Sequence, residues 1–238
     1  ARELGLRAVI LIPEDASPVK VAGTRALGAE VLQEGITLVN REERLRSEAA
    51  ARGMAVVHPF DDWEMIHGHA SAALEALEDD PELGAFVVPI GGGGLVSGIA
   101  LAVKATRPAV RVIGVEPAAA DDARRSFESR TLQRLGQVPQ TVADGVRPMA
   151  IGTRPFEVLI EHGLLDDVIT VGEEEILDAT RAAWLGGKVV VEPTGALPLA
   201  AWRSGQVRAE GPVALLLSGG NADPRLMARV LDPGSAKG

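Results

Sequence analysis

The sequence is poor in several residue types, and each shortage narrows what the protein can do. It has no cysteine, which excludes disulfides and thiolate metal sites and fits a reducing compartment such as the cytoplasm. It has no tyrosine, and aromatic residues make up only 3% of the chain, so stacking on nucleic-acid bases is not expected. The net charge of −9 likewise disfavours nucleic acid and anionic membranes as partners, because both need clustered lysine and arginine.

Long apolar runs are also lacking, and none approaches the roughly 18 residues of a membrane-spanning helix. Hydrophobic residues nevertheless supply 46% of the 238 positions, which is enough for one large packed domain or two modest ones. Composition therefore leaves small-molecule substrates open and disfavours nucleic acid and membrane.

Strand-like and helix-like patterns alternate along most of the chain. Wholly apolar runs at 8–12, 85–90 and 213–217 are typical of strands buried on both faces. Amphipathic segments of helical period separate them, which predicts an α/β fold: an open, mostly parallel, twisted sheet with helices on both faces. A further strand is expected at 54–58, and the long polar segment 116–154 is interpreted as a break in the pattern.

Four consecutive glycines, Gly91 to Gly94, follow the apolar run 85–90 and precede a helix expected at 95–106. A backbone without Cβ atoms approaches a phosphate closely and adopts positive φ without strain. Its amides would lie at the positive end of the helix dipole, so we expect a phosphorylated ligand there. A tight connection without a ligand is the plainer alternative. The G-x-G-x-x-G fingerprint of nicotinamide and flavin sites fails at Ser97.

Polar residues follow two other expected strands. Glu116 and Asp122 offer oxygen ligands that suit Mg²⁺ or Ca²⁺, but a solvated acidic loop that caps the next helix is the plainer interpretation. Ser218 either hydrogen-bonds a ligand or caps a turn. Glu192 stands just before an expected helix, where an acid is favoured in any case.

Together these segments resemble the fold-type II pyridoxal-phosphate enzymes, and among them the threonine dehydratase and serine racemase group. The matching segments occur in the family's order and span nearly the whole chain. They are Pro13–Ala16, Lys20–Glu30, His58–Asp62, Val88–Gly98, Gly114–Pro117, Ala143–Gly145, Glu192–Gly195 and Ser218–Asn221. The resemblance implies two domains: the remainder of a small α/β domain over residues 1–59, and the bulk of a large cofactor-binding domain over residues 60–238.

The resemblance also implies roles for particular residues. The cofactor would be pyridoxal 5′-phosphate, with Ser218 hydrogen-bonded to the pyridine nitrogen and Gly145 and Glu192 lining the site. The phosphate would be held by Gly91, Gly92, Gly93, Gly94 and the amide of Leu95. A structural or activating cation, Mg²⁺ or else Ca²⁺ or Mn²⁺, would be held by Glu116, the Ala120 carbonyl and Asp122, which reverses the plainer interpretation of that loop.

The implied reaction is β-elimination from L-threonine or L-serine to a 2-oxo acid and ammonia, which a neutral hydroxyl at Ser218 suits. Serine racemase and hydroxyaspartate dehydratase are the alternatives within the family. The resemblance further implies a homodimer that acts on a small amino acid.

Two motifs of this family are not found: the S-x-K-x-R segment, whose lysine forms the Schiff base, and the S-x-N-H-x-Q substrate loop. None of the four lysines, Lys20, Lys104, Lys188 and Lys237, has a matching context. No catalytic residue is therefore assigned, and the chain as given is expected to be N-terminally incomplete and inactive. Three hypotheses stay open: a truncated dehydratase, a non-catalytic ligand-binding remnant, and one half of a split enzyme.

Overall fold

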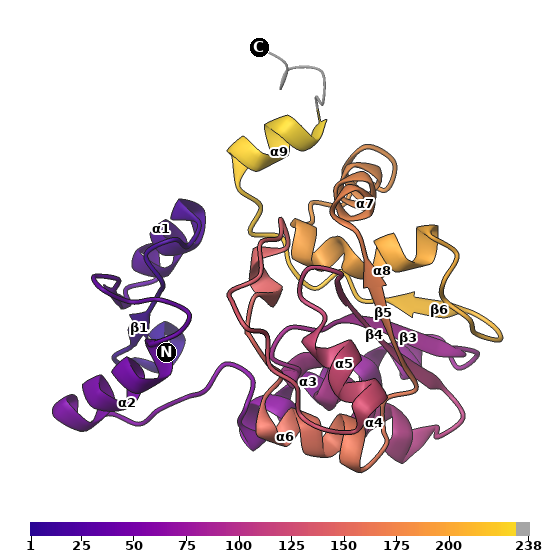
Figure 1. Cartoon of the computed structure of the whole chain (residues 1–238), viewed down its shortest axis with the longest axis horizontal. Helices are drawn as coiled ribbons and strands as arrows, with labels where there is room; N and C mark the ends of the chain where they lie inside the picture. Colours follow the sequence, from indigo (N-terminus) through magenta and orange to yellow (C-terminus); the bar gives the residue numbers. More distant parts are fainter. Residues whose placement is uncertain (232–238) are drawn as a thin grey trace. The chain divides into compact units, whose positions relative to one another are not determined.

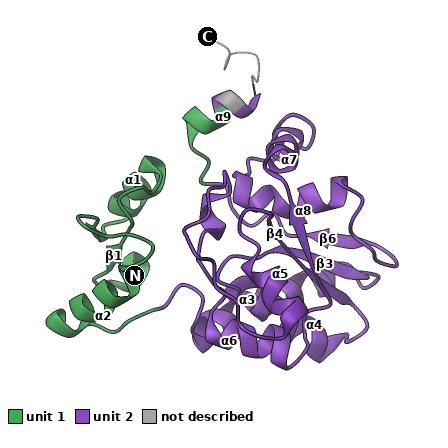
Figure 2. Cartoon of the chain, in the orientation of Figure 1, with its two compact units in different colours: residues 1–57, 221–227 green, residues 58–220, 228–238 purple. Residues whose placement is uncertain are grey.

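The computed structural model describes residues 1–231, apart from the side chain of Arg229. The chain divides into two compact units (Figure 2). The first unit is Ala1–Val57 with Asn221–Met227, and the second is His58–Gly220 with the residues from Ala228 onward. The domain boundary expected after residue 59 stays a prediction about the family's domains. Along the sequence, the first unit ends at Val57 and the second begins at His58, and residues 221–227 belong to the first unit.

The first unit contains a small parallel sheet and two helices. Strands β1 (Val9–Leu11) and β2 (Glu30–Leu32) pair in register, with Val9 opposite Glu30. The unit also holds a 3₁₀ turn (Arg2–Leu4), α1 (Pro18–Ala26) and α2 (Arg41–Arg52). The strand expected at 54–58 does not form. Val56 and Val57 are exposed, and no described strand pairs with this segment, so its backbone lacks the partner that a strand requires.

The second unit is built on a four-stranded parallel sheet in the order β5–β4–β3–β6. These strands are β3 (Ala85–Pro89), β4 (Arg111–Pro117), β5 (Asp167–Val171) and β6 (Val213–Leu215). Its helices are α3 (Trp63–Asp79), α4 (Gly94–Thr106), α5 (Asp122–Ser129), α6 (Thr153–Phe156), a π-helical turn (Glu157–Glu161), α7 (Glu173–Leu185) and α8 (Pro193–Arg203). The last helix, α9, covers Pro224–Leu231.

Helices cover both faces of this sheet, which explains why its strands are apolar throughout. Phe86 and Val88 of β3 pack into the cluster that includes α3 and α4, whereas Ala85 and Val87 pack into the cluster that includes α7 and α8. Figure 1 shows the sheet between these two helical layers. The predicted α/β class, with a parallel sheet and helices on both faces, is confirmed.

The segment 116–154 is more ordered than the sequence indicates. It contains α5 and a 3₁₀ turn (Asp144–Val146). α5 escapes a hydrophobic-pattern analysis because its buried residues are small or polar, namely Asp122, Ala123 and Ser126. Across the described residues, no helix combines the length and apolar character needed to span a membrane.

Candidate functional site

The glycine turn between β3 and α4 presents a row of open amides. Gly93 adopts φ 90° as the residue that caps α4. The ladder ends with Ile90 N donating to Val115 O at 2.8 Å, and the next amide along the chain that donates to a backbone oxygen is Ser97 N, to Gly93 O at 3.0 Å. Within the described chain, no acceptor is found for the amides from Gly91 to Leu95. Five such donors at the start of a 13-residue helix are what an anion needs.

The turn is tightly packed, and its neighbours leave no room for side chains. A Cβ added at Gly92 or Gly94 would lie closer than 3.0 Å to Phe60, and one at Gly93 would lie 2.7 Å from Cβ of Pro155. Glycine is therefore required here by packing as well as by the positive φ of Gly93. The four glycines are not the floppy linker that their composition would permit.

Direct contacts connect this turn to two other predicted segments. A Cβ at Gly91 would lie 3.3 Å from the carbonyl oxygen of Gly145. The amide of Gly145 donates to Oγ1 of Thr194 at 2.9 Å, which brings it to the start of α8. Glu192 N donates to Gly219 O at 2.8 Å, which joins α8 to the turn after β6. The structure thus gathers the predicted segments beyond the carboxyl ends of β3 and β6.

Glu192 and Ser218 differ in exposure at this junction. Glu192 is buried, and a Cβ at Gly219 would lie closer than 3.0 Å to its Oε1, so the carboxylate would have to move to admit a side chain there. Ser218, one residue earlier, is exposed. A buried carboxylate and an exposed hydroxyl therefore lie next to the backbone of Gly219. Their roles toward a cofactor stay predictions.

Two buried carboxyl groups lie where β4 ends and α5 begins. Glu116 accepts hydrogen bonds from Arg124 N at 2.7 Å and from Ala123 N at 3.2 Å. Burial, and then the charge of Asp122, hold the pKa of Glu116 well above its usual range in spite of these amides. Burial likewise raises the pKa of Asp122 to about 7. Oδ2 of Asp122 is buried without a hydrogen-bond partner in the described chain.

The burial of these two carboxyl groups favours a site for a hard cation over the interpretation as a solvated loop. Glu116 does cap α5, as the plainer interpretation expected, but both carboxyl groups are buried, as is Ala120. Among the described residues, no three histidine, cysteine or acidic side chains are grouped so that they could hold a metal ion. The predicted set of ligands contains two carboxylate side chains, and its third ligand is the carbonyl oxygen of Ala120. The cation stays a prediction.

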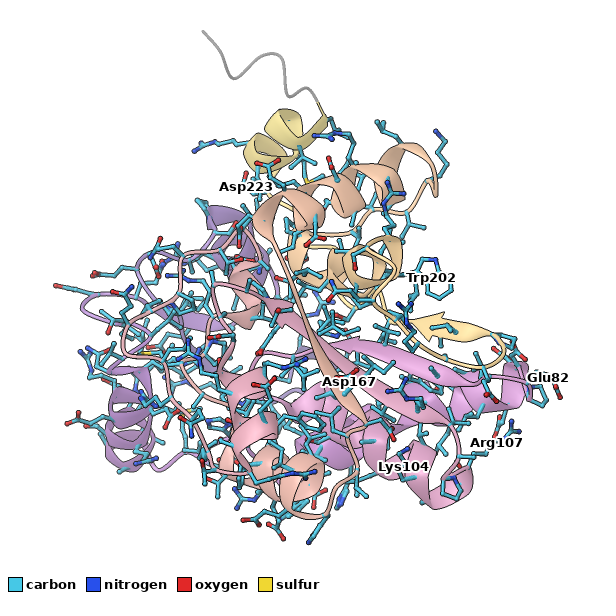
Figure 3. The ribbon with its side chains drawn as sticks, turned by 45° about the vertical axis from the view of Figure 1, so that its right-hand side comes forward. Glu82, Lys104, Arg107, Asp167, Trp202 and Asp223 are labelled. Carbon is cyan, nitrogen blue, oxygen red and sulfur yellow. The ribbon has the colours of Figure 1, made fainter. Side chains whose placement is uncertain are left out.

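The two described lysines of the second unit are engaged elsewhere. Lys104, at the far end of α4 (Figure 3), pairs with Asp166 at 2.7 Å and donates to Val110 O at 2.8 Å. Its Cα lies ten residues, or about 15 Å, along the helix from Gly94. Lys188 donates to Leu185 O at 2.6 Å.

The other two lysines are not among the described residues of the second unit. Lys20 belongs to the first unit, and Lys237 lies outside the described residues.

Sequence reasoning missed two residues that shape the site. Thr194 receives the Gly145 amide, and Phe60 lies against two of the four glycines. Both residues lie in segments that carry the family resemblance, 192–195 and 58–62. Their position in these motifs, rather than their chemistry, could have indicated that they shape the site.

Comparisons with known proteins agree on one family. A family model described as "Pyridoxal-phosphate dependent enzyme" matches residues 1–219. The chain is 36% identical to the L-threo-3-hydroxyaspartate ammonia-lyase of Saccharomyces cerevisiae, covering 97% of this chain and 70% of that protein. It is 39% identical to the L-threonine ammonia-lyase of Geobacter sulfurreducens, covering 97% and 57%.

A solved structure gives the same result. The crystal structure of a threonine deaminase from T.th. matches with a TM-score of 0.88 at 48% identity, covering 94% of this chain and 72% of that one. The chain thus spans between 57% and 72% of the length of these relatives.

Proposed function

The chain belongs to the fold-type II pyridoxal-phosphate dependent enzymes, in the threonine deaminase and serine racemase group, and on that premise we propose that it is the phosphate-binding part of an ammonia-lyase. The proposed reaction converts L-threonine or L-serine to a 2-oxo acid and ammonia. The observation that carries the proposal is the run of amides from Gly91 to Leu95, which have no acceptor among the described residues. They stand at the helix end that favours an anion.

The residues around the turn would hold the cofactor from several sides. When bound, pyridoxal phosphate supplies an electron sink for the bonds at Cα of the amino acid. The amides bind the phosphate dianion, the Ser218 hydroxyl hydrogen-bonds the pyridine nitrogen, and Gly145 and Glu192 border the ring. A neutral hydroxyl leaves that nitrogen largely unprotonated, which moderates the electron sink and suits β-elimination over chemistry that needs a stronger one.

A divalent cation is part of the proposal, held by Glu116, the Ala120 carbonyl and Asp122. It is supported by the raised pKa values of both buried carboxyl groups and by the unpartnered Oδ2 of Asp122. Mg²⁺, Ca²⁺ or Mn²⁺ would accept these oxygen ligands. The cation would be structural or activating, and its ligands would join the end of β4 to the start of α5.

The activity is tested on the natural protein that carries this chain, loaded with pyridoxal phosphate and Mg²⁺. We expect ammonia and a 2-oxo acid from L-threonine and L-serine. Release of D-serine as the main product would favour serine racemase instead, and turnover of L-threo-3-hydroxyaspartate alone would favour a hydroxyaspartate dehydratase. Cofactor binding without any turnover would favour a non-catalytic ligand-binding protein.

We also propose that the protein assembles as a homodimer, by resemblance to the group. Sedimentation equilibrium of the natural protein at micromolar concentration tests this. A monomer across that range would contradict it.

A further inference from the structure

The segment His58–Asp62 lies across the glycine turn. A Cβ added at Gly92 would lie closer than 3.0 Å to Cγ, Cδ1 and Cδ2 of the Phe60 ring. A Cβ added at Gly94 would meet the Cα, Cβ and carbonyl oxygen of the same residue within 2.9 Å. Phe60 therefore covers the side of the turn from which side chains would project. It packs its ring on one glycine and its backbone on another.

Hydrogen bonds fix the position of this segment. Nδ1 of His58 accepts from Asp61 N at 2.8 Å, and its ring meets the Phe60 ring edge-on at 4.6 Å between centroids. The Asp61 carboxylate accepts from Thr153 N at 3.2 Å and from Arg154 N at 2.9 Å. The main chain on both sides of Phe60 is thereby held, at His58 and at the start of α6.

The start of α6, which holds Asp61, is in turn hydrogen-bonded to the glycine turn. Gly152, immediately before α6, donates its amide to the carbonyl oxygen of Gly92 at 2.9 Å. Gly92 is thus held by the Phe60 ring and by a hydrogen bond to its carbonyl oxygen. A closed path runs from Gly92 to Phe60, through Asp61 to α6, and back through Gly152.

We propose that Phe60 is a positioning residue for the phosphate of the cofactor. Four consecutive glycines lose more backbone entropy on ordering than any other tetrapeptide would. With the Phe60 ring in place, the amides from Gly91 to Leu95 are already ordered before an anion binds, so this entropy does not reduce the affinity. The inference rests on the proposed function, because it assumes that a phosphate binds at the turn.

The test compares the parent chain with Phe60→Leu and Phe60→Ala by isothermal titration with pyridoxine 5′-phosphate. This probe carries the phosphate but no aldehyde, so no lysine adduct forms. We expect each variant to bind about tenfold more weakly, because the cost of ordering the turn returns at binding. Phe127→Leu is the matched control: Phe127 is half-buried like Phe60 and packs against the core of the second unit from α5, under the guanidinium of Arg130. Its affinity is expected to change less than about twofold.

Amide hydrogen exchange of the ligand-free chain supplies a second readout that a general loss of packing would not reproduce. Phe60→Leu should accelerate exchange of the hydrogen-bonded amides of Ser97 and Gly152, which donate to Gly93 O and Gly92 O, and leave β4 unchanged. If Phe60→Ala fails to fold, the comparison of Phe60→Leu with Phe127→Leu decides.

The possible outcomes distinguish a failure of the proposed function from a failure of the proposed role of Phe60. A parent chain that does not bind pyridoxine 5′-phosphate overturns the proposed function, and this inference with it. A parent that binds, with Phe60→Leu equal in affinity and in exchange, overturns the inference alone. An equal weakening in Phe127→Leu also overturns it.

Discussion

Gly92 and Gly136 differ in what surrounds them, and the difference can be measured. A methyl group at Gly92 would collide with Phe60, whereas one at Gly136 would meet nothing within 4 Å. We expect Gly92→Ala to lower the free energy of unfolding by about 1–3 kcal/mol, as overpacking does. Gly136→Ala should change it by less than about 0.5 kcal/mol. Urea denaturation followed by circular dichroism measures both.

Removing the ring should relieve that collision. In the Gly92→Ala background, Phe60→Ala is expected to cost less stability than it does in the parent chain, because the two sites are coupled. Additive effects would show that the ring and the turn are not in contact.

The buried carboxyl group of Asp122 predicts a pH dependence of stability. Its pKa of about 7 in the folded chain exceeds the ordinary value of 3.8. The folded state therefore keeps a proton that the unfolded state has lost, and the stabilisation, complete below about pH 4, disappears as the pH rises through 7. In EDTA-containing buffer, the free energy of unfolding of the parent should fall between pH 5 and pH 8. Asp122→Asn should reduce that fall by about 1–3 kcal/mol.

Glu116 keeps part of the pH dependence, since its pKa is raised for the same reason. The Asp122→Asn profile should therefore be shallower rather than flat. A profile as steep as that of the parent would show that Asp122 ionises normally. Adding Mg²⁺ at pH 8 should stabilise the parent and not Asp122→Asn, which tests the proposed cation separately.

The sequence was sufficient to predict the role of residues that act through their local backbone. The glycine run indicated an anion site because the absence of four Cβ atoms in succession is visible in the primary structure. The contact of Phe60 with the glycine turn could not be predicted, because the partner of an aromatic side chain depends on which distant segment the fold brings beside it. Thr194 was hidden for the same reason, because its hydrogen bond to Gly145 crosses 49 positions.

Elements whose own pattern determines them were predicted closely. β3 and α4 form within one residue of the ranges expected at 85–90 and 95–106, because β3 is uniformly apolar and α4 shows a helical period. The strand expected at 54–58 was wrong because strands need partners, which a local pattern does not reveal. α5 was missed because two of its three buried residues, Asp122 and Ser126, are polar.

The two serines of α5 test this explanation. Ser126 donates to Asp122 O at 2.6 Å and accepts from Gln133 N at 2.9 Å, whereas Ser129 is exposed. Ser126→Ala would leave the Gln133 amide without that acceptor, so we expect a loss of about 1–3 kcal/mol of stability. Ser129→Ala should cost less than about 0.5 kcal/mol. Guanidinium titration of both variants checks this, and equal effects would contradict a structural role for Ser126.

At the scale of the whole molecule, alternation of strands and helices sufficed to predict the α/β class, and the resemblance supplied the family. The sequence could not show which of the predicted cofactor residues lie side by side within the second unit, His58–Gly220. That result depends on the order of strands in the sheet, with β6 placed beside β3 although 123 residues separate Pro89 from Val213. Only the folded chain brings Ser218 to the same edge as the glycine turn.

The distribution of lysines over the molecule gives a last prediction. Pyridoxal phosphate followed by borohydride marks any lysine that forms a Schiff base, and peptide mass spectrometry locates it. We expect no adduct on Lys104, because its ammonium is largely buried, paired with Asp166 and hydrogen-bonded to Val110 O. Asp166→Asn, which removes the paired charge, should increase labelling of Lys104 and serves as the positive control. Stoichiometric labelling of Lys104 in the parent would show that its engagement with Asp166 does not prevent it from acting as a cofactor lysine.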